Sequence, residues 1–171
     1  MTYLLDANVF IAAKNLHYGL DFCPAFWDWL IQYNAGGHVF SVEKVGEEVR
    51  ALGDELSVWA EARGPGFFLP PDSDTLPALA AVGNWATGQH YEPAAISTFL
   101  QVADYYLVAQ AVARQYVIVT HEVPSASTRK IKIPDACIGM RIRCMSPYEM
   151  LRRERARFIL CLLYTSDAAD E

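Results

Sequence analysis

Two acidic residues follow short apolar segments of the sequence. Asp6 comes directly after the apolar residues 3–5, and Glu122 closes the triplet Thr120-His121-Glu122 after the apolar residues 117–119. If both segments are strands of one parallel sheet, their carboxyl ends meet at the same edge, where open parallel sheets bind ligands. We therefore expect the two carboxylates to lie together at that edge.

Helical periodicity selects two further acids. We expect a helix that is capped by Ser41 and runs to about Ala62, and on it Glu48 lies beside the apolar stripe whereas Glu47 points away. That stripe consists of Val45, Val49, Leu52, Leu56 and Trp59. In a later helix Asp104 shares a face with Leu107, Val108, Ala111 and Val112. A carboxylate on such a face is costly unless something compensates its charge.

A divalent cation would compensate several converging carboxylates. Mg²⁺ and Mn²⁺ prefer carboxylate oxygens and water as ligands, and a bound ion can activate water and stabilise charge that develops on phosphorus. Each acid also has an ordinary structural interpretation. Asp6 could end a strand or cap a helix, Glu48 could be solvated, Asp104 could be a helix N-cap, and Asp135 could cap the helix that follows Pro134.

Short apolar segments alternate with helical patterns along the chain. We expect strands at 3–5, 38–40, 67–69, 116–119 and 141–145. We expect helices at 7–15, 22–33, 42–62, 72–88, 93–99, 103–115 and 135–140, and a last one opened by Ser146-Pro147. Strands that are apolar along their whole length are typical of a parallel sheet covered on both faces. The pattern predicts a three-layer α/β/α sandwich with a short parallel sheet.

Charge is unevenly distributed between the two parts of the chain. Acidic residues outnumber basic ones in residues 1–110, and basic residues outnumber acidic ones in 111–160. This separation suits a protein that binds a metal in one place and phosphate in another. Arg129, Lys130 and Lys132 lie in a predicted loop, where they could contact a nucleic-acid backbone or simply be solvated.

Composition excludes several classes of protein. The 171 residues contain no P-loop, dinucleotide-binding or serine-hydrolase motif, and the four cysteines and four histidines lack zinc-ligand spacing. No apolar stretch approaches the roughly 20 residues that span a bilayer. The amino terminus lacks the basic start of a signal peptide, so we expect a cytoplasmic protein.

The last eleven residues, CLLYTSDAADE, are treated separately. They resemble the in-frame translation of a transposon-end adapter used in sequencing libraries. We therefore expect one domain over residues 1–160 and a non-native, adapter-derived tail over 161–171.

Four segments, in this order, resemble PIN domains. YLLDANVFI resembles the opening strand and D-x-N motif of that family, EEV near position 48 resembles its helical acid, ADYYLVAQA resembles its D-x-x-x-A-x-A helix, and VTHE occupies the place of its T-x-D. These segments fall within residues 3–122. The chain is most similar to VapC-like toxins and to a poorly characterised PIN branch that carries an IPDAC-like segment, here Ile133 to Cys137.

This resemblance implies an endoribonuclease that needs one or two Mg²⁺ or Mn²⁺ ions and cuts single-stranded RNA. Such proteins are often the toxin of a type II toxin–antitoxin pair, bound by an antitoxin protein, and often form homodimers. By resemblance, the principal catalytic and metal-binding carboxylates are Asp6, Glu48 and Asp104, with Glu122 as the fourth acid. Asn8 and Thr120 would support them through hydrogen bonds.

The fourth acid departs from the family pattern. PIN domains usually carry Asp where this chain has Glu122, whose side chain is one carbon longer. Asp135 could therefore bind metal instead of Glu122 or beside it. Two alternatives remain open: a structure-specific DNA nuclease, and a catalytically weak PIN-like module that binds RNA or protein.

Overall fold

Five short strands form one parallel sheet in the order β3-β2-β1-β4-β5. The computed structural model describes residues 1–160, so the predicted adapter-derived tail at 161–171 lies outside the described residues. The strands are β1 (Tyr3–Leu5), β2 (Val39–Val42), β3 (Phe68–Leu69), β4 (Val117–Val119) and β5 (Cys144–Met145). All five correspond to segments expected from the sequence.

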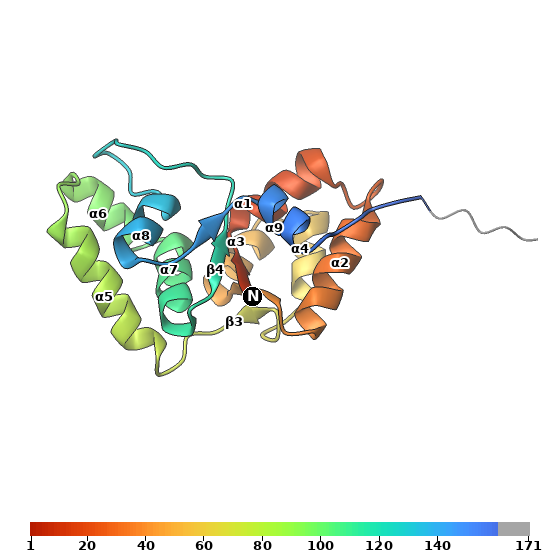
Figure 1. Cartoon of the computed structure of the whole chain (residues 1–171), viewed down its shortest axis with the longest axis horizontal. Helices are drawn as coiled ribbons and strands as arrows, with labels where there is room; N and C mark the ends of the chain where they lie inside the picture. Colours follow the sequence, from red (N-terminus) through yellow and green to blue (C-terminus); the bar gives the residue numbers. More distant parts are fainter. Residues whose placement is uncertain (161–171) are drawn as a thin grey trace, which may run out of the picture.

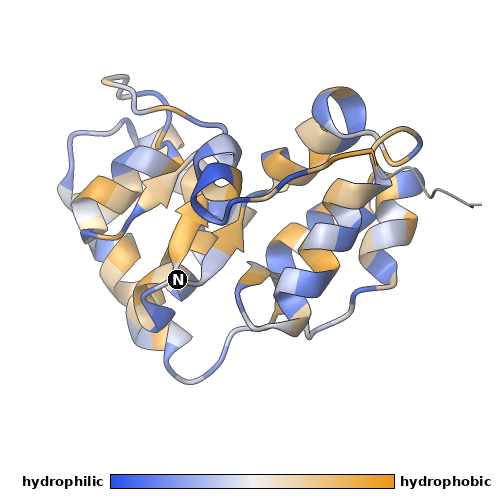
Figure 2. Cartoon of the chain, turned by 45° about the vertical axis from the view of Figure 1, so that its right-hand side comes forward, coloured by the Kyte–Doolittle hydropathy of each residue, from blue (hydrophilic) through white to orange (hydrophobic). Residues whose placement is uncertain are grey.

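Helices cover both faces of this sheet, which confirms the predicted α/β/α architecture. One side carries α1 (Ala7–Ala12), the short π-helix η1 (Ala13–His17), α2 (Pro24–Ala35), α4 (Glu55–Glu61) and α9 (Pro147–Arg153), and the other carries α5 (Thr75–Gly88), α6 (Pro93–Phe99), α7 (Ala103–Arg114) and α8 (Ile133–Met140) (Figure 1). Helix α3 (Glu43–Arg50) contacts both α1 and α7. Every residue of β1 and β4 is buried, and Figure 2 shows the strands as an apolar layer between amphipathic helices.

The direction in which successive strands are added to the sheet reverses between β1 and β4. From β1 it proceeds outward to β2 and β3, then crosses the sheet to add β4 on the other side of β1. Open α/β sheets bind ligands beyond the carboxyl ends of the strands at such a switch point. The fold therefore places the residues after Leu5 and Val119 where a site is expected.

The long helix predicted after Ser41 is wrong in two respects. Ser41 does not cap it, because Ser41 belongs to β2 and its hydroxyl donates a hydrogen bond of 2.6 Å to the Leu5 carbonyl. The helix also divides into α3 and α4. Gly53 adopts a φ of 68°, which favours glycine, and Asp54 then starts α4 with a capping box.

No helix among residues 1–160 is both long enough and apolar enough to cross a lipid bilayer.

The contact between α5 and α8 leaves no room for a side chain at Gly139. A Cβ atom there would overlap the indole ring of Trp85, whereas a Cβ at Gly88, the last residue of α5, would meet nothing within 4 Å. We expect Gly139→Ala to lower the free energy of unfolding by about 1–3 kcal/mol through overpacking. Gly88→Ala, measured beside it by urea denaturation, should be neutral or stabilising. Equal stability of the two variants would contradict this packing.

Candidate active site

The pairing of β1 with β4 brings Asp6 next to Thr120. Leu5 is in register with Val119, and the Asp6 amide continues the ladder by donating a 3.0 Å hydrogen bond to the Val119 carbonyl. The Asp6 side chain is only 5% exposed. This confirms that residues following the two strands meet at one edge of the sheet.

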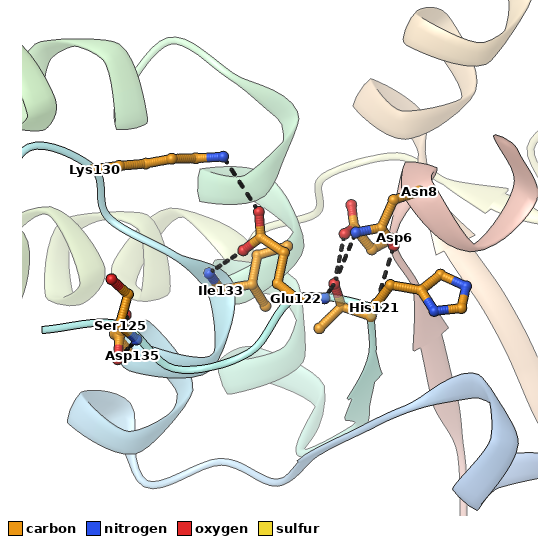
Figure 3. A network of polar contacts seen from close by, with 9 residues as sticks. Asp6, Asn8, His121, Glu122, Ser125, Lys130, Ile133 and Asp135 are labelled. Carbon is orange, nitrogen blue, oxygen red and sulfur yellow. Dashed lines mark hydrogen bonds and ion pairs between the residues drawn. The ribbon is translucent and has the colours of Figure 1, made fainter. Parts of the chain in front are cut away.

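A hydrogen-bond network centred on Thr120 fixes this edge. Figure 3 labels its partners Asp6, Asn8 and Glu122. The Thr120 hydroxyl donates to Asp6 Oδ2 at 2.8 Å and accepts from Asn8 Nδ2 at 3.2 Å and from the Glu122 amide at 3.1 Å. The Asn8 side chain also accepts a 3.2 Å hydrogen bond from the His121 amide. Thr120 and Asn8 thus hold the Asp6 carboxylate in one orientation and join the loop after β4 to α1.

The four principal acids line a single cavity of about 1100 Å³. Asp6 comes from the end of β1, Glu48 from α3, Asp104 from α7 and Glu122 from the loop after β4. The interpretation of Asp104 as an N-cap is wrong, because Val102 occupies that position and Asp104 lies in the first turn of α7. Carboxylates from four separate elements therefore converge on one space.

Burial and mutual repulsion make the ionised form of this cluster costly. Desolvation, followed by the charge of Asp104, raises the pKa of Asp6 to about 7, although the Thr120 hydrogen bond opposes the shift. Desolvation, followed by the charges of Glu122 and Glu48, raises the pKa of Asp104 to about 6. Burial also raises the pKa of Glu48. The charge of Lys130 lowers the pKa of Asp104 and so compensates this cost only in part.

The donor set fits a hard divalent cation. The cluster offers carboxylate oxygens, which Mg²⁺ and Mn²⁺ prefer. A cation between them would stabilise the ionised carboxylates against both burial and mutual repulsion, which together raise the pKa values of Asp6 and Asp104. Within residues 1–160 no three Asp, Glu, His or Cys side chains are already close enough to form a complete metal-binding group. A bound ion would therefore need water ligands or movement of the carboxylates toward it.

Glu122 is partly neutralised by its own loop. Its carboxylate accepts a hydrogen bond of 2.9 Å from the Ile133 amide and lies 3.4 Å from Lys130 Nζ (Figure 3). The side chain still borders the cavity. The longer Glu side chain thus lets one residue both close the loop from 122 to 133 and face the other acids.

Asp135 lies apart from the four acids. Both of its carboxylate oxygens accept from the Ser125 amide at 3.2 Å, and the residue does not line the cavity (Figure 3). It is not the cap of α8 either, since Lys132 occupies that position. Its observed role is to anchor the loop that carries Ser125.

The sequence did not single out Lys44, Glu47 and Tyr106, which also line the cavity. Lys44 forms a 3.0 Å ion pair with Glu47 and lies 5.6 Å from the centre of the Tyr106 ring. Glu47 points away from the apolar stripe, as expected, but its exposed side chain also borders the cavity. These three residues could have been found from the true start of α3 at Glu43. Its first turn lies at the same edge of the sheet as Asp6.

The predicted phosphate contacts divide into two groups. Arg129 and Lys130 line the cavity, whereas Lys132 does not. Together with Lys44 they place cationic side chains around an acidic centre. Such an arrangement can hold an anionic substrate against a cation that the acids bind.

Comparison with known proteins identifies the family. A family model described as a domain of unknown function, DUF4411, matches residues 3–158, and the chain therefore belongs to the DUF4411 family. No curated protein and no solved structure matches the chain.

Proposed function

We propose that this member of the DUF4411 family is an endoribonuclease of the PIN-domain type that hydrolyses RNA phosphodiesters with the help of Mg²⁺ or Mn²⁺. The observation that carries the proposal is the convergence of Asp6, Glu48, Asp104 and Glu122 on one cavity. Three of these acids, Asp6, Asp104 and Glu48, have raised pKa values, first because they are buried and, for Asp6 and Asp104, also because other acids lie nearby. Ionisable side chains whose pKa values are strongly shifted by burial and by neighbouring charges are typical of functional sites.

The residues divide into those that would hold the cation and those that would position the substrate. Asp6 and Asp104 would bind the ion, with Glu48 and Glu122 completing its environment. A divalent ion held there supplies an activated water as nucleophile and positive charge for the phosphate oxygens. Thr120 and Asn8 keep the Asp6 carboxylate oriented, and Lys44, Arg129 and Lys130 would bind the phosphates on either side of the reacting one.

The biological role follows from the resemblance to VapC-like toxins. We propose that the protein is the toxin of a type II pair, that an antitoxin protein binds it, and that it forms a homodimer. The basic residues Arg152, Arg153, Arg155 and Arg157 in and after α9 offer a surface for an acidic partner. Co-expression with the product of an adjacent small gene would test this part of the proposal.

The primary test is cleavage of a mixed pool of single-stranded and structured RNAs by the full chain. We expect cutting within single-stranded regions in Mn²⁺ or Mg²⁺ and none in EDTA. Without a cation, the acids offer no positive charge to stabilise the transition state. Single-stranded and flap-containing DNA are assayed in parallel. Preferential cutting of DNA would replace the RNA substrate with a DNA one.

The second candidate function is an RNA-binding module with little turnover. It is favoured by Glu122, whose carboxylate already binds Ile133 and Lys130 and is less free to bind a cation. RNA binding in EDTA together with no cutting in either metal would support this alternative. The nuclease proposal would be overturned if the protein neither cuts RNA nor binds Mn²⁺, as measured by calorimetry.

A further inference from the structure

A second cavity lies on the other side of the segment that follows β4. Its volume is about 440 Å³, and it shares Glu122 with the acidic cavity. The loop after β4, α8, β5 and the start of α9 enclose it. The nuclease proposed above makes no use of this space.

Two aromatic rings form part of its wall. The ring centres of His121 and Tyr148 are 5.7 Å apart, and their planes meet at 63°. His17 braces the pair from behind, because its Nε2 lies 3.0 Å from the Tyr148 hydroxyl and its ring centre lies 5.7 Å from that of His121. His17 ends the π-helix η1, a form of helix that often occurs at functional sites.

The remaining wall combines apolar and polar groups. Ile142, Met145 and Cys137 provide apolar surface, and the Glu149 carboxylate provides hydrogen-bond acceptors. One Glu149 oxygen caps α9 by accepting from the Ser146 amide, and the side chain is exposed. A flat ring with polar edges matches these walls, since its faces need aromatic and apolar contacts while its amino groups need acceptors.

The second cavity adjoins the acidic one, because Glu122 lines both. Thr120 lines it and also donates its hydroxyl to Asp6, and the His121 amide donates to Asn8. A nucleotide whose phosphate lies among the acids therefore has a cavity for an adjoining base only a few residues away. A base can enter such a cavity only when it is unpaired.

We propose that this second cavity binds one unpaired nucleobase of single-stranded RNA, stacked on the ring of Tyr148 with its edge against His121, next to the phosphate that the acidic cavity binds. The inference rests on the proposed function for the identity of the substrate. It adds a reason for a preference for single strands, because a paired base cannot leave its helix without losing its pairing and stacking. Base stacking on aromatic side chains tolerates all four bases, and the Glu149 carboxylate would favour those with amino groups.

The test measures binding without turnover. Five-nucleotide RNAs of each base, labelled with a fluorophore, are titrated with the full chain in Ca²⁺, a hard cation that carboxylates also bind, and each position is replaced in turn by an abasic nucleotide. Gel electrophoresis checks that the RNAs stay intact. We expect one abasic position to weaken binding about tenfold and the others to have little effect. Tyr148→Leu should abolish that positional dependence, whereas Tyr148→Phe should retain it because the ring remains.

Tyr116→Leu is the matched control. Tyr116 precedes β4 and so lies at the opposite end of the strand from the cavity, and its loss should not change the abasic profile. Thermal melting of each variant shows whether the fold is intact. If Tyr148→Leu is unstable, His121→Leu replaces it, because it removes the other ring of the wall and keeps the His121 amide that bonds Asn8.

The outcomes separate this inference from the nuclease proposal. The nucleobase site is overturned if every abasic position has the same effect on binding, or if Tyr148→Leu leaves the effect of the sensitive position unchanged. Metal-dependent cutting in the same protein would leave the nuclease proposal intact. A single sensitive position that depends on the Tyr148 ring supports the site even when no cutting occurs. Absence of any RNA binding overturns the site and would leave the cavity to a peptide of a protein partner.

Discussion

Asp6→Asn and Asp104→Asn are each expected to reduce metal-dependent RNA cleavage by on the order of 1,000-fold, equivalent to about 4 kcal/mol of transition-state stabilisation. Each substitution replaces a charged ligand with a neutral amide of nearly the same shape. The loss of charge weakens cation binding, whereas the size of the side chain and most of its hydrogen bonds are retained. Initial rates at saturating Mn²⁺ on one defined single-stranded RNA measure the effect.

Asp28→Asn is the control for this experiment. Asp28 lies exposed on α2 and lines none of the cavities described, so its substitution removes one negative charge away from the site. We expect its cleavage rate to match that of the wild type. A wild-type rate for Asp104→Asn, in a variant that melts normally, would remove Asp104 from the catalytic group.

The same assay resolves which residue is the fourth acid. Glu122→Gln should lower the rate strongly, because Glu122 lines the cavity and its charge raises the pKa values of both Asp6 and Asp104. Asp135→Asn should have a smaller effect, transmitted through the loop that it anchors at Ser125. The reverse order of effects would contradict this assignment.

Asp6→Asn is also expected to stabilise the protein at pH 8 in the absence of metal. The pKa of Asp6 is about 7 in the folded chain, against 3.8 for an unperturbed Asp. The folded state therefore holds this proton more tightly than the unfolded state, so the free energy of unfolding falls as pH rises from about 4 to 7. The difference corresponds to about 2–4 kcal/mol at pH 8, which the neutral Asn avoids.

The measurement is urea denaturation of the wild type and Asp6→Asn at pH 5 and pH 8 in EDTA. The stabilisation should be large at pH 8 and much smaller at pH 5, where Asp6 is already mostly protonated. Asp28→Asn serves again as the control and should show no such pH dependence. An Asp6→Asn variant that is less stable than the wild type at pH 8 would show that the ionised carboxylate is compensated by the protein itself.

Addition of Mn²⁺ provides a second readout of the same electrostatics. A cation that binds the folded state raises its stability in proportion to the logarithm of the ion concentration. We expect Mn²⁺ at pH 8 to raise the melting temperature of the wild type and to have little effect on Asp6→Asn or Asp104→Asn. Equal shifts in all three proteins would indicate that Mn²⁺ binds elsewhere.

The sequence determined the layers of the fold and most of the strand positions. Segments such as residues 3–5 and 117–119 are apolar throughout, which is required only when helices cover both faces of a sheet, so the α/β/α architecture followed from local pattern. The positions of Asp6 and Glu122 after two such segments followed from the rule for parallel sheets. Asp104 was selected because a lone carboxylate on an apolar helix face needs an explanation.

Only the tertiary structure decided how the acids are oriented and which polar groups join them. Helical periodicity distinguished Glu48 from Glu47, but both are exposed on α3 and both line the cavity, because the cavity borders the surface of the helix and not its buried stripe. The choice between Glu122 and Asp135 depended on the path of the loop from 122 to 133, which local pattern does not specify. The cavity beside His121 likewise required η1, β4 and α9 to meet, since residues 17, 121 and 148 are neighbours only through long-range packing.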